Sequence, residues 1–284
     1  MVTVAPDRLV PLVLENALPR DRSEAEIRGY RLALDLIYKD TGHLAVTPDL
    51  FRRLHGLIQE GAGDAGEWKR LDNEIVELRE GTAPLVRFRP VSAAETPAAV
   101  EELCLAYRHV LNQRQAPPLL AAACLVLDFL IIHPFRDGNG RVSRLLTLLV
   151  LDQHGYGVGR YISLERLIEE TRAAYYDVLR RSSEGWHEGR HVLLPWLNYF
   201  LATLRMAFVE LETRIGQAKA PRGAKTAMVE SAIAAFPGDF TLADLERACP
   251  CVSHDLVRRV LRQLQGEGRI ECVGRGPGAR WRRC

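Results

Sequence analysis

Residues 133–144 contain side chains that together could carry out a transfer reaction on a phosphate. The segment reads His133-Pro-Phe-Arg-Asp-Gly-Asn-Gly-Arg-Val-Ser-Arg144. Imidazole has an unperturbed pKa of about 6.5, so His133 can take a proton from a hydroxyl at neutral pH. Asp137 supplies a carboxylate, the side chain with which proteins typically hold Mg²⁺ beside substrate phosphates. The combination predicts a site that positions a triphosphate, neutralises it and deprotonates an incoming hydroxyl.

A glycine-containing turn and two arginines complete this predicted site. Residues 138–140, Gly-Asn-Gly, tolerate positive φ, so we expect their N–H groups to converge on an anion. The next helix starts here, and its N-terminal amides point at the same place. Arg141 and Arg144 are three residues apart, hence on one helix face, where guanidinium groups suit the outer phosphates of a nucleotide. Phe135 is expected to anchor the loop to the core.

Helices must hold this loop in place. Residues 118–132 are apolar nearly all round, which predicts a buried helix ending at His133, and residues 141–154 predict its partner beyond the loop. Capping residues mark other helix starts. These starts are Ser23 with Glu26, Thr47-Pro48, Thr96-Pro97 and Ser163, the last beginning a helix through Leu179, and one more helix is predicted over 194–215.

A β-hairpin is predicted between Trp68 and Pro90. Residues 74–78 and 85–88 alternate in part between polar and apolar side chains, and they flank Glu80-Gly81. This is the only strand pair predicted in the first 220 residues, so the fold class is mainly α.

The C-terminal region predicts a second, smaller α+β domain. A linker over 219–225 would separate residues 1–218 from residues 226–284. Helices are predicted over 226–236, 241–248 and from Ser253 to Gly266, followed by a ribbon of strands at 269–273 and 279–283. This is the order of a winged helix-turn-helix. From Pro221 onward, 11 Lys and Arg stand against 7 Asp and Glu, which favours a polyanionic partner.

Bulk properties indicate a cytoplasmic protein. No basic stretch followed by an apolar one marks a secretory signal, and no apolar run reaches the roughly 20 residues that span a bilayer. Six cysteines without a signal peptide favour reduced thiols. A zinc site at Cys249, Cys251, His254 and Cys272 is disfavoured because no paired CxxC is present. We therefore expect no membrane partner.

The loop 133–144 is similar, at every defining position, to the signature of the Fic (filamentation induced by cAMP) family, and the resemblance covers roughly residues 20–215. It implies a Fic-type helical bundle with a hairpin flap, and a protein adenylyltransferase that transfers AMP from ATP to a target hydroxyl with Mg²⁺. His133 would be the general base, Asp137 the metal ligand, and Arg141 and Arg144 the holders of the β- and γ-phosphates. The residues expected at the nucleotide are Phe135, Arg136, Asp137, Gly138, Asn139, Gly140, Arg141, Arg144, Tyr175 and Tyr176. Those expected in the flap, which would pair with the target protein, are Asn73, Glu74, Ile75 and Val76.

Two parts of this resemblance leave alternatives open. Tyr175 and Tyr176 match a pair near the nucleotide base, but they equally suit core aromatics on a helix. The family's inhibitory helix ends in a glutamate that pairs with the second arginine, and the closest string here ends at Glu15, with proline where a hydroxyl residue belongs. Restraint is either missing through truncation, degenerate at Glu15, or supplied by a separate inhibitory protein; a homodimer is a further candidate partner. We hypothesise that the chain is relatively unrestrained.

Two functions from different classes remain. In the first, the chain transfers AMP to a Ser, Thr or Tyr hydroxyl; Gly140 favours this over phosphorylation, because Doc-type relatives have lysine there, while phosphocholine transfer stays open. In the second, it is a DNA-binding regulator whose Fic domain binds nucleotide with little transfer. The candidate DNA contacts are Arg258, Arg259, Arg262, Arg275 and Arg280.

Overall fold

The chain folds into two compact units. The computed structural model describes residues 6–15, 17–77, 85–218, 223–236, 238–249, 252–274 and 279–283. The units comprise Met1–Val209 and Glu210–Cys284, so the division falls within helix α9 (Leu194–Ala218). Each unit has a hydrophobic core of its own.

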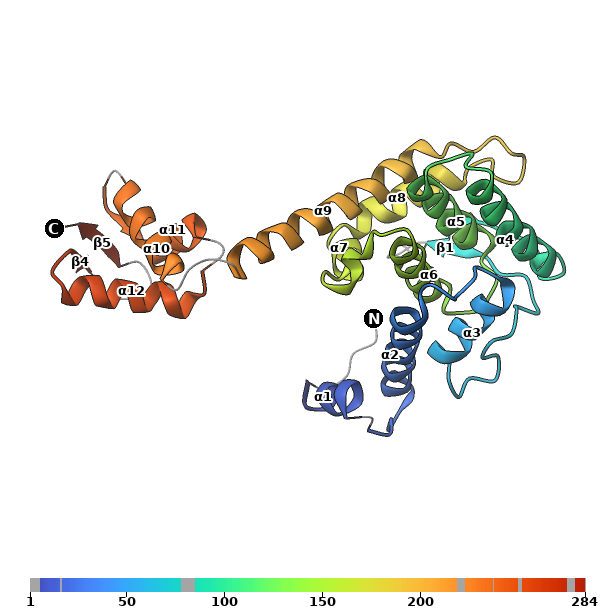
Figure 1. Cartoon of the computed structure of the whole chain (residues 1–284), viewed down its shortest axis with the longest axis horizontal. Coiled ribbons are helices and arrows are strands. Elements are labelled where there is room, and N and C mark those ends of the chain that lie inside the picture. Colours follow the sequence, from blue (N-terminus) through green and yellow to red (C-terminus); the bar gives the residue numbers. More distant parts are fainter. Residues whose placement is uncertain are drawn as a thin grey trace. The chain divides into compact units, whose positions relative to one another are not determined.

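The first unit is a bundle of helices with one small hairpin, which agrees with the mainly α fold class (Figure 1). Its helices before α9 are α1 (Pro6–Leu14), α2 (Arg22–Asp40), α3 (Pro48–Ile58), α4 (Thr96–Asn112), α5 (Pro118–Ile132), α6 (Asn139–Gln153), α7 (Leu164–Glu170) and α8 (Arg172–Ser183), with a 3-10 turn at Gly157–Arg160.

Helix α5 is the centre of this core. It packs against α4 and α6, and ten of its fifteen residues are buried, as the nearly continuous apolar sequence predicts. Phe129 of α5 meets Phe51 of α3 edge to face, with ring centroids 5.2 Å apart. The end of α5 is thereby fixed on several sides, and the loop 133–138 starts from a rigid point.

Helices α2 and α3 approach closely at a glycine. A Cβ on Gly29 would lie 1.9 Å from the carbonyl oxygen of Leu57, so no larger residue fits there without moving α2. The N-cap of α2 is Asp21, which accepts from the amide of Glu24, and the prediction of Ser23 as the cap is wrong by two residues. Asp21 takes this role because its backbone is extended, which an N-cap requires.

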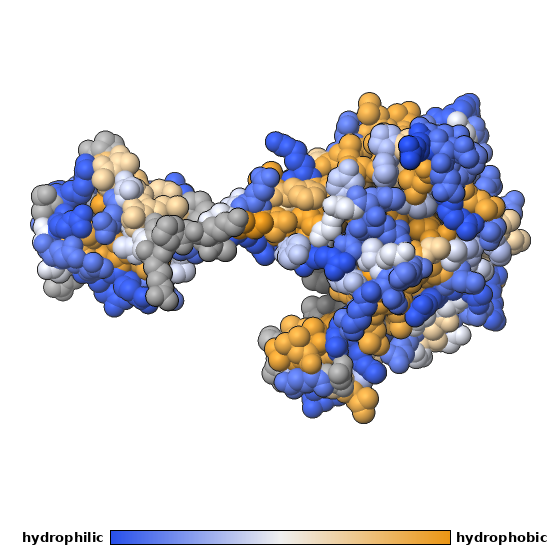
Figure 2. Space-filling view, viewed as in Figure 1, coloured by the Kyte–Doolittle hydropathy of each residue, from blue (hydrophilic) through white to orange (hydrophobic). Residues whose placement is uncertain are grey.

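Helix α1 was not predicted, and a long-range ion pair holds it. Arg8 donates to both carboxylate oxygens of the buried Glu24, at 2.9 and 2.8 Å. The guanidinium lowers the pKa of Glu24 to about 2. Hydrophobic side chains nevertheless remain at the surface of α1, including Leu9 and Val10 (Figure 2, lower part).

Two other helix predictions need correction. Thr96 lies inside α4, fully buried, and its hydroxyl donates to the carbonyl of Ser92; the N-cap is Glu95. The single helix predicted from Ser163 to Leu179 is two helices, α7 and α8, which meet at Thr171. Ser163 does cap α7 by accepting from the amide of Arg166.

The predicted hairpin consists of β1 (Ile75–Glu77) and β2 (Leu85–Phe88), paired antiparallel with an irregularity between Ile75 and Val76. Its turn, including Glu80-Gly81, lies outside the described residues.

The second unit places three helices against a small sheet. They are α10 (Ala224–Ala235), α11 (Leu242–Ala248) and α12 (His254–Gly266), and the strands β3 (Phe240–Thr241), β4 (Ile270–Val273) and β5 (Arg280–Arg283) are ordered β3-β5-β4, antiparallel throughout. Strand β3 was not predicted. A capping box between Thr241 and Asp244 starts α11. The buried face of α12 comprises Val257, Val260, Leu261 and Leu264.

Candidate active site

His133 occupies a strained backbone position at the C-cap of α5. Its φ is 52° and its ψ is 60°, a left-handed conformation that a residue with a Cβ rarely adopts and that costs of order 1–2 kcal/mol. The ring nitrogen Nδ1 lies 3.2 Å from the carbonyl oxygen of Leu130. Because a carbonyl oxygen only accepts, Nδ1 carries the proton and Nε2 is left with its lone pair. Burial lowers the pKa of His133, so the imidazole is neutral at pH 7, as a general base must be.

Asn139 locks the loop in shape. Its side chain is 2% exposed; Oδ1 accepts from the amide of Phe135 at 3.0 Å, and Nδ2 donates to the carbonyl of the same residue at 2.8 Å. Phe135 is fully buried, with its ring stacked on His55 at 3.8 Å between centroids. Both side chains therefore serve the loop itself, and neither offers a free group to a nucleotide. Arg136, also predicted at the nucleotide, is exposed.

Asp137 presents a carboxylate on the outer side of the loop, with 64% of its side chain exposed. One oxygen accepts from the amide of Gly138 at 2.7 Å, and the other lies 3.4–3.6 Å from Gln59, Arg22 and Arg141. Hydrogen bonds and neighbouring guanidinium groups lower the pKa of this carboxyl against the opposing effect of burial. An ionised, accessible carboxylate fits the way Mg²⁺ is held through one carboxylate plus substrate phosphates.

The glycines of the turn differ in role. Only Gly138 has positive φ, at 80°, and a Cβ there would lie 3.1 Å from Gln59 Nε2 and 3.4 Å from His55. The expectation of positive φ at Asn139 and Gly140 is wrong, because both have already entered the first turn of α6. Their amides have no acceptor among the described residues. The N-terminus of α6 is thus open to an anion.

The two arginines at the start of α6, Arg141 and Arg144, lie in different surroundings. Arg141 Nη1 pairs with Glu26 of α2 at 2.6 Å, and the side chains are 18% and 12% exposed. Arg144 has no hydrogen-bond or ion-pair partner in the described part of the chain, and its Nε is buried. Glu15, the residue suspected of pairing with Arg144, is exposed and makes no such pair. The second guanidinium is therefore available to a ligand.

Residues that carry no motif support this loop, and sequence reasoning missed them. His55 accepts from the amide of Gly66 at Nδ1 (2.9 Å), so its Nε2 donates to the carbonyl of Asp137 at 3.2 Å. Burial lowers the pKa of His55, which preserves this neutral tautomer. Glu26, Gln59 and Lys69 also face the loop. Of these residues, only Glu26 has a sequence signal, its capping-box spacing from Ser23.

The predicted flap residues lie beside this loop. Asn73 accepts from Lys69 and donates to the carbonyl of Phe135 at 3.4 Å. Glu74 pairs with Arg89 across the hairpin at 3.0 Å. Ile75 is half-buried, whereas Val76 exposes 46% of its surface. Strand β1 pairs only with β2 in the described residues, so its other edge has backbone groups free for a further strand.

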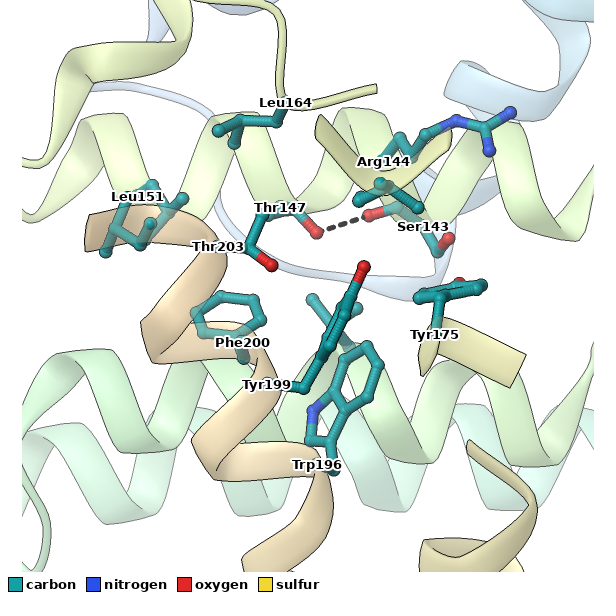
Figure 3. Close-up of a pocket in the computed structure, with 13 residues that line it drawn as sticks. Ser143, Arg144, Thr147, Leu151, Leu164, Tyr175, Trp196, Tyr199, Phe200 and Thr203 are labelled. Carbon is teal, nitrogen blue, oxygen red and sulfur yellow. Dashed lines mark hydrogen bonds between the residues drawn. The ribbon is translucent and has the colours of Figure 1, made fainter. Parts of the chain in front are cut away.

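The tyrosine pair separates into one core residue and one surface residue. Tyr175 packs against Tyr176, Trp196 and Tyr199 and lines a cavity of about 40 Å³ behind Arg144 (Figure 3). Ligand pockets typically measure about 300–1,000 Å³, so this cavity has no room for a nucleotide. Tyr176 is 58% exposed and lies under Arg172, whose guanidinium carbon is 5.8 Å from the ring centroid. Of the two, Tyr176 has the accessible ring.

The basic residues of the second unit also divide into those on the open face of α12 or exposed on β5, where Arg262 donates only to the carbonyl of Arg258 at 3.4 Å, and those held by ion pairs or several hydrogen bonds. Arg258, Arg259 and Arg262 lie on the exposed face of α12, and Arg280 is exposed on β5. Arg275 lies outside the described residues. The neighbouring arginines of β5 are not free: Arg282 binds Asp239 with two bonds of 2.9 Å, and Arg283 donates to the carbonyls of Ala234 and Phe236.

Two further features of the described residues bear on ligands. No three His, Cys, Asp or Glu side chains within the described ranges form a metal cluster; Cys249 is buried in the core of the second unit, and His254 pairs with Glu246. Across those same ranges, every helix is too short or too polar to cross a bilayer.

Comparison with known proteins identifies the family. The Fic/DOC family model matches residues 45–151, which include α3, the hairpin, α4, α5 and the loop. A Fido domain-containing protein of Dictyostelium discoideum is 34% identical over 110 residues, 36% of this chain and 73% of that protein. The protein adenylyltransferase Fic of Aedes aegypti is 38% identical over 78 residues, but the match spans 26% of this chain and 14% of that protein. A solved Fic family protein from Desulfovibrio desulfuricans G20 shares the fold, with a TM-score of 0.58 and 21% identity over 99% of this chain and 82% of that one. Sequence, fold and loop geometry agree, and this chain belongs to the Fic/DOC family.

Proposed function

We propose that this chain is a protein adenylyltransferase, which transfers AMP from ATP to a Ser, Thr or Tyr hydroxyl of a target protein. The observation that carries the proposal is His133. Its Nδ1–H is committed to Leu130, its Nε2 is unprotonated, and its pKa is lowered by burial. A protein that only senses a nucleotide has no need of a neutral imidazole held in a strained conformation.

In the proposed transfer, the bonds made and broken lie in the target hydroxyl and ATP, and His133 takes the proton. The hydroxyl oxygen attacks the α-phosphorus, the bond from that phosphorus to the β-phosphate oxygen breaks, and pyrophosphate leaves. Nε2 of His133 takes the hydroxyl proton. The amides of Asn139 and Gly140 and the guanidinium of Arg144, all without protein partners in the described residues, suit the phosphate oxygens. Catalysis then depends on positioning and charge neutralisation.

Asp137 would hold Mg²⁺ together with phosphate oxygens of the substrate. The ion neutralises negative charge on the triphosphate when it is bound. What the chain itself supplies is orientation: Gln59, Gly138 and His55 fix the carboxylate and its backbone at the mouth of the loop.

The free edge of β1 suits the target protein. An extended target segment that added to this edge would form main-chain hydrogen bonds, and alternate side chains such as Val76 would contact it. Asn73 connects this edge to the loop through Phe135. Docking at the hairpin would therefore place a target hydroxyl near His133.

The relatives support AMP as the transferred group. The Aedes aegypti protein that this chain partly matches is named a protein adenylyltransferase, although the match spans 14% of it. Gly140 differs from the lysine of Doc-type relatives that phosphorylate, and a Cβ at this position would meet open space. Transfer of phosphocholine or phosphate is the alternative outcome.

Transfer of labelled ATP in a host lysate tests the proposal. The parent chain should label at least one protein, and mass spectrometry should find AMP on a hydroxyl side chain. His133→Ala should abolish the label, whereas the control His109→Ala, at an exposed histidine of α4, should not. Equal labelling by the parent and by His133→Ala would contradict the proposal.

A second candidate function belongs to the C-terminal unit, which we propose is a winged helix that binds DNA. Its element order and sheet order support this fold, and Arg258, Arg259 and Arg262 share the exposed face of α12. A mobility shift that weakens with salt and is unaffected by His133→Ala would support DNA binding. If such a shift occurred without any protein labelling, the chain would be a regulator and not a transferase.

A further inference from the structure

Lys69 is a buried lysine beneath the catalytic loop. It is 4% exposed, and no ion pair reaches it from the described residues. Its ammonium donates to the carbonyl of Ile132 at 3.2 Å and to Oδ1 of Asn73 at 3.0 Å. Its own backbone amide donates to the carbonyl of Pro134 at 2.9 Å. One residue thereby binds the carbonyls immediately before and after His133.

These bonds act where the backbone is strained. The left-handed conformation of His133 ends α5, and the last carbonyls of a helix have no intrahelical partner. A lysine at this end satisfies one of them and interacts favourably with the helix dipole. The bonds from Lys69 restrain the peptide group between Ile132 and His133 and the one between Pro134 and Phe135, and therefore the direction in which the imidazole of His133 points.

The same ammonium connects the loop to the hairpin. Asn73, four residues after Lys69, accepts from the ammonium and donates to the carbonyl of Phe135. Ile75, the first residue of β1, follows two residues later. The strand that we propose receives the target protein is thus tied to the loop that carries the base.

The charge of Lys69 has an electrostatic effect of its own. Burial lowers the pKa of Lys69 to about 8, against the opposing influence of Asp72. The positive charge in turn lowers the pKa of His133, while Asp137 raises it. Placing a lysine in this position is unfavourable compared with an apolar residue of similar volume, so packing alone does not account for it.

We propose that Lys69 is a positioning residue, which holds His133 and the first residues of the hairpin in the arrangement that transfer requires. The inference rests on the proposed role of His133 as the general base. A purely structural role would predict a loss of stability alone, whereas a positioning role predicts specific changes at His133.

The first test needs no activity. In NMR titrations of histidine-labelled protein, with the His133 signal assigned by its loss in His133→Ala, Lys69→Met should raise the pKa of His133. Amide hydrogen exchange over 133–136 should become faster. Lys69→Arg should retain the parental values because it keeps the charge and the donors. The control Arg70→Met removes a positive charge from the exposed neighbouring residue and should change neither reading.

The second test is transfer from labelled ATP. Lys69→Met should lower kcat by about 100-fold, as a misplacement of about 1 Å does, with little change in the KM for ATP. If Lys69→Met does not fold, Lys69→Gln, which keeps a donor for Ile132 without the charge, replaces it. An unchanged His133 titration and unchanged exchange in a folded variant would overturn the inference. If Lys69→Met changed the His133 titration and the exchange as expected, but the parent chain transferred nothing from ATP, the proposed function would be overturned instead.

Discussion

Replacing Asn139 by alanine should destabilise the first unit by about 3 kcal/mol. The substitution removes both bonds to Phe135, whose amide and carbonyl are buried. A buried donor or acceptor left without a partner costs about 1–3 kcal/mol. The amide loses its only partner among the described residues, whereas the carbonyl keeps the long bond from Asn73, so the second loss is the smaller.

Thermal or denaturant unfolding, followed by tryptophan fluorescence, measures this loss. Trp68 is 5.0 Å from the ring of Phe135, and Trp186 and Trp196 also lie in the first unit. A loss of about 3 kcal/mol corresponds to a fall in Tm of about 6–12 °C for a unit of this size. Hydrogen exchange at Phe135 should accelerate in the same variant.

Ser143→Ala is the matched control for this experiment. Ser143 is also buried on α6, but its hydroxyl donates only to the carbonyl of Gly140, within its own helix. Its removal should cost at most about 1 kcal/mol. If Asn139→Ala lost no more stability than Ser143→Ala, the Asn139 side chain would not be what holds the loop.

Three other predictions follow from the described contacts. Stability should fall as the pH drops from about 7 to 5, because burial lowers the pKa of three buried or partly buried histidines in the folded state. The unfolded chain therefore takes up protons near pH 6.5 that the folded chain does not, and a flat Tm over this range would refute the prediction. These histidines are His55, His133 and His154. Glu26→Gln should tighten ATP binding by about tenfold in calorimetry, because it removes a negative charge 2.6 Å from Arg141; weaker binding would mean instead that Glu26 orients that guanidinium. Arg259→Ala should reduce the slope of log affinity for DNA against log salt by about 0.9, whereas Arg282→Ala, whose side chain is held by Asp239, should leave the slope unchanged; equal effects would contradict this division of the arginines.

Local sequence signals predicted the elements whose ends are decided locally. Thr47 caps α3 by accepting from the amide of Leu50, and the proline after it starts the helix. The apolar run 118–132 coincides with α5. Where a tertiary contact decides, the prediction failed: α1 depends on the pair between Arg8 and Glu24, residues 16 apart.

The side chains proposed for the active site stand close together in the sequence, whereas the residues that support them do not. The loop 133–144 carries the candidate side chains in one segment, and their types and spacing predict phosphate chemistry. Lys69 and His55 each stand alone in the sequence, without a repeat or a neighbouring partner that would mark them. Their roles arise from hydrogen bonds to backbone carbonyls 63 and 82 residues away, which no local pattern encodes.

The contact of a glutamate with the arginines of the motif is also one that no local sequence pattern encodes. The resemblance to the family directs attention to a pair of Glu15 with Arg144. In the structure, Glu26 of α2 forms an ion pair with Arg141 instead. Arg144 remains without a partner among the described residues.

The position of the label in ATP tests the central proposal most directly. Compared with lysate alone, lysate incubated with the parent chain should acquire additional label from ATP marked at the α-phosphate and no additional label from ATP marked at the γ-phosphate, and His133→Ala should abolish the former. Additional label from the γ-phosphate, or additional label from the α-phosphate that persisted in His133→Ala, would contradict AMP transfer with His133 as its base.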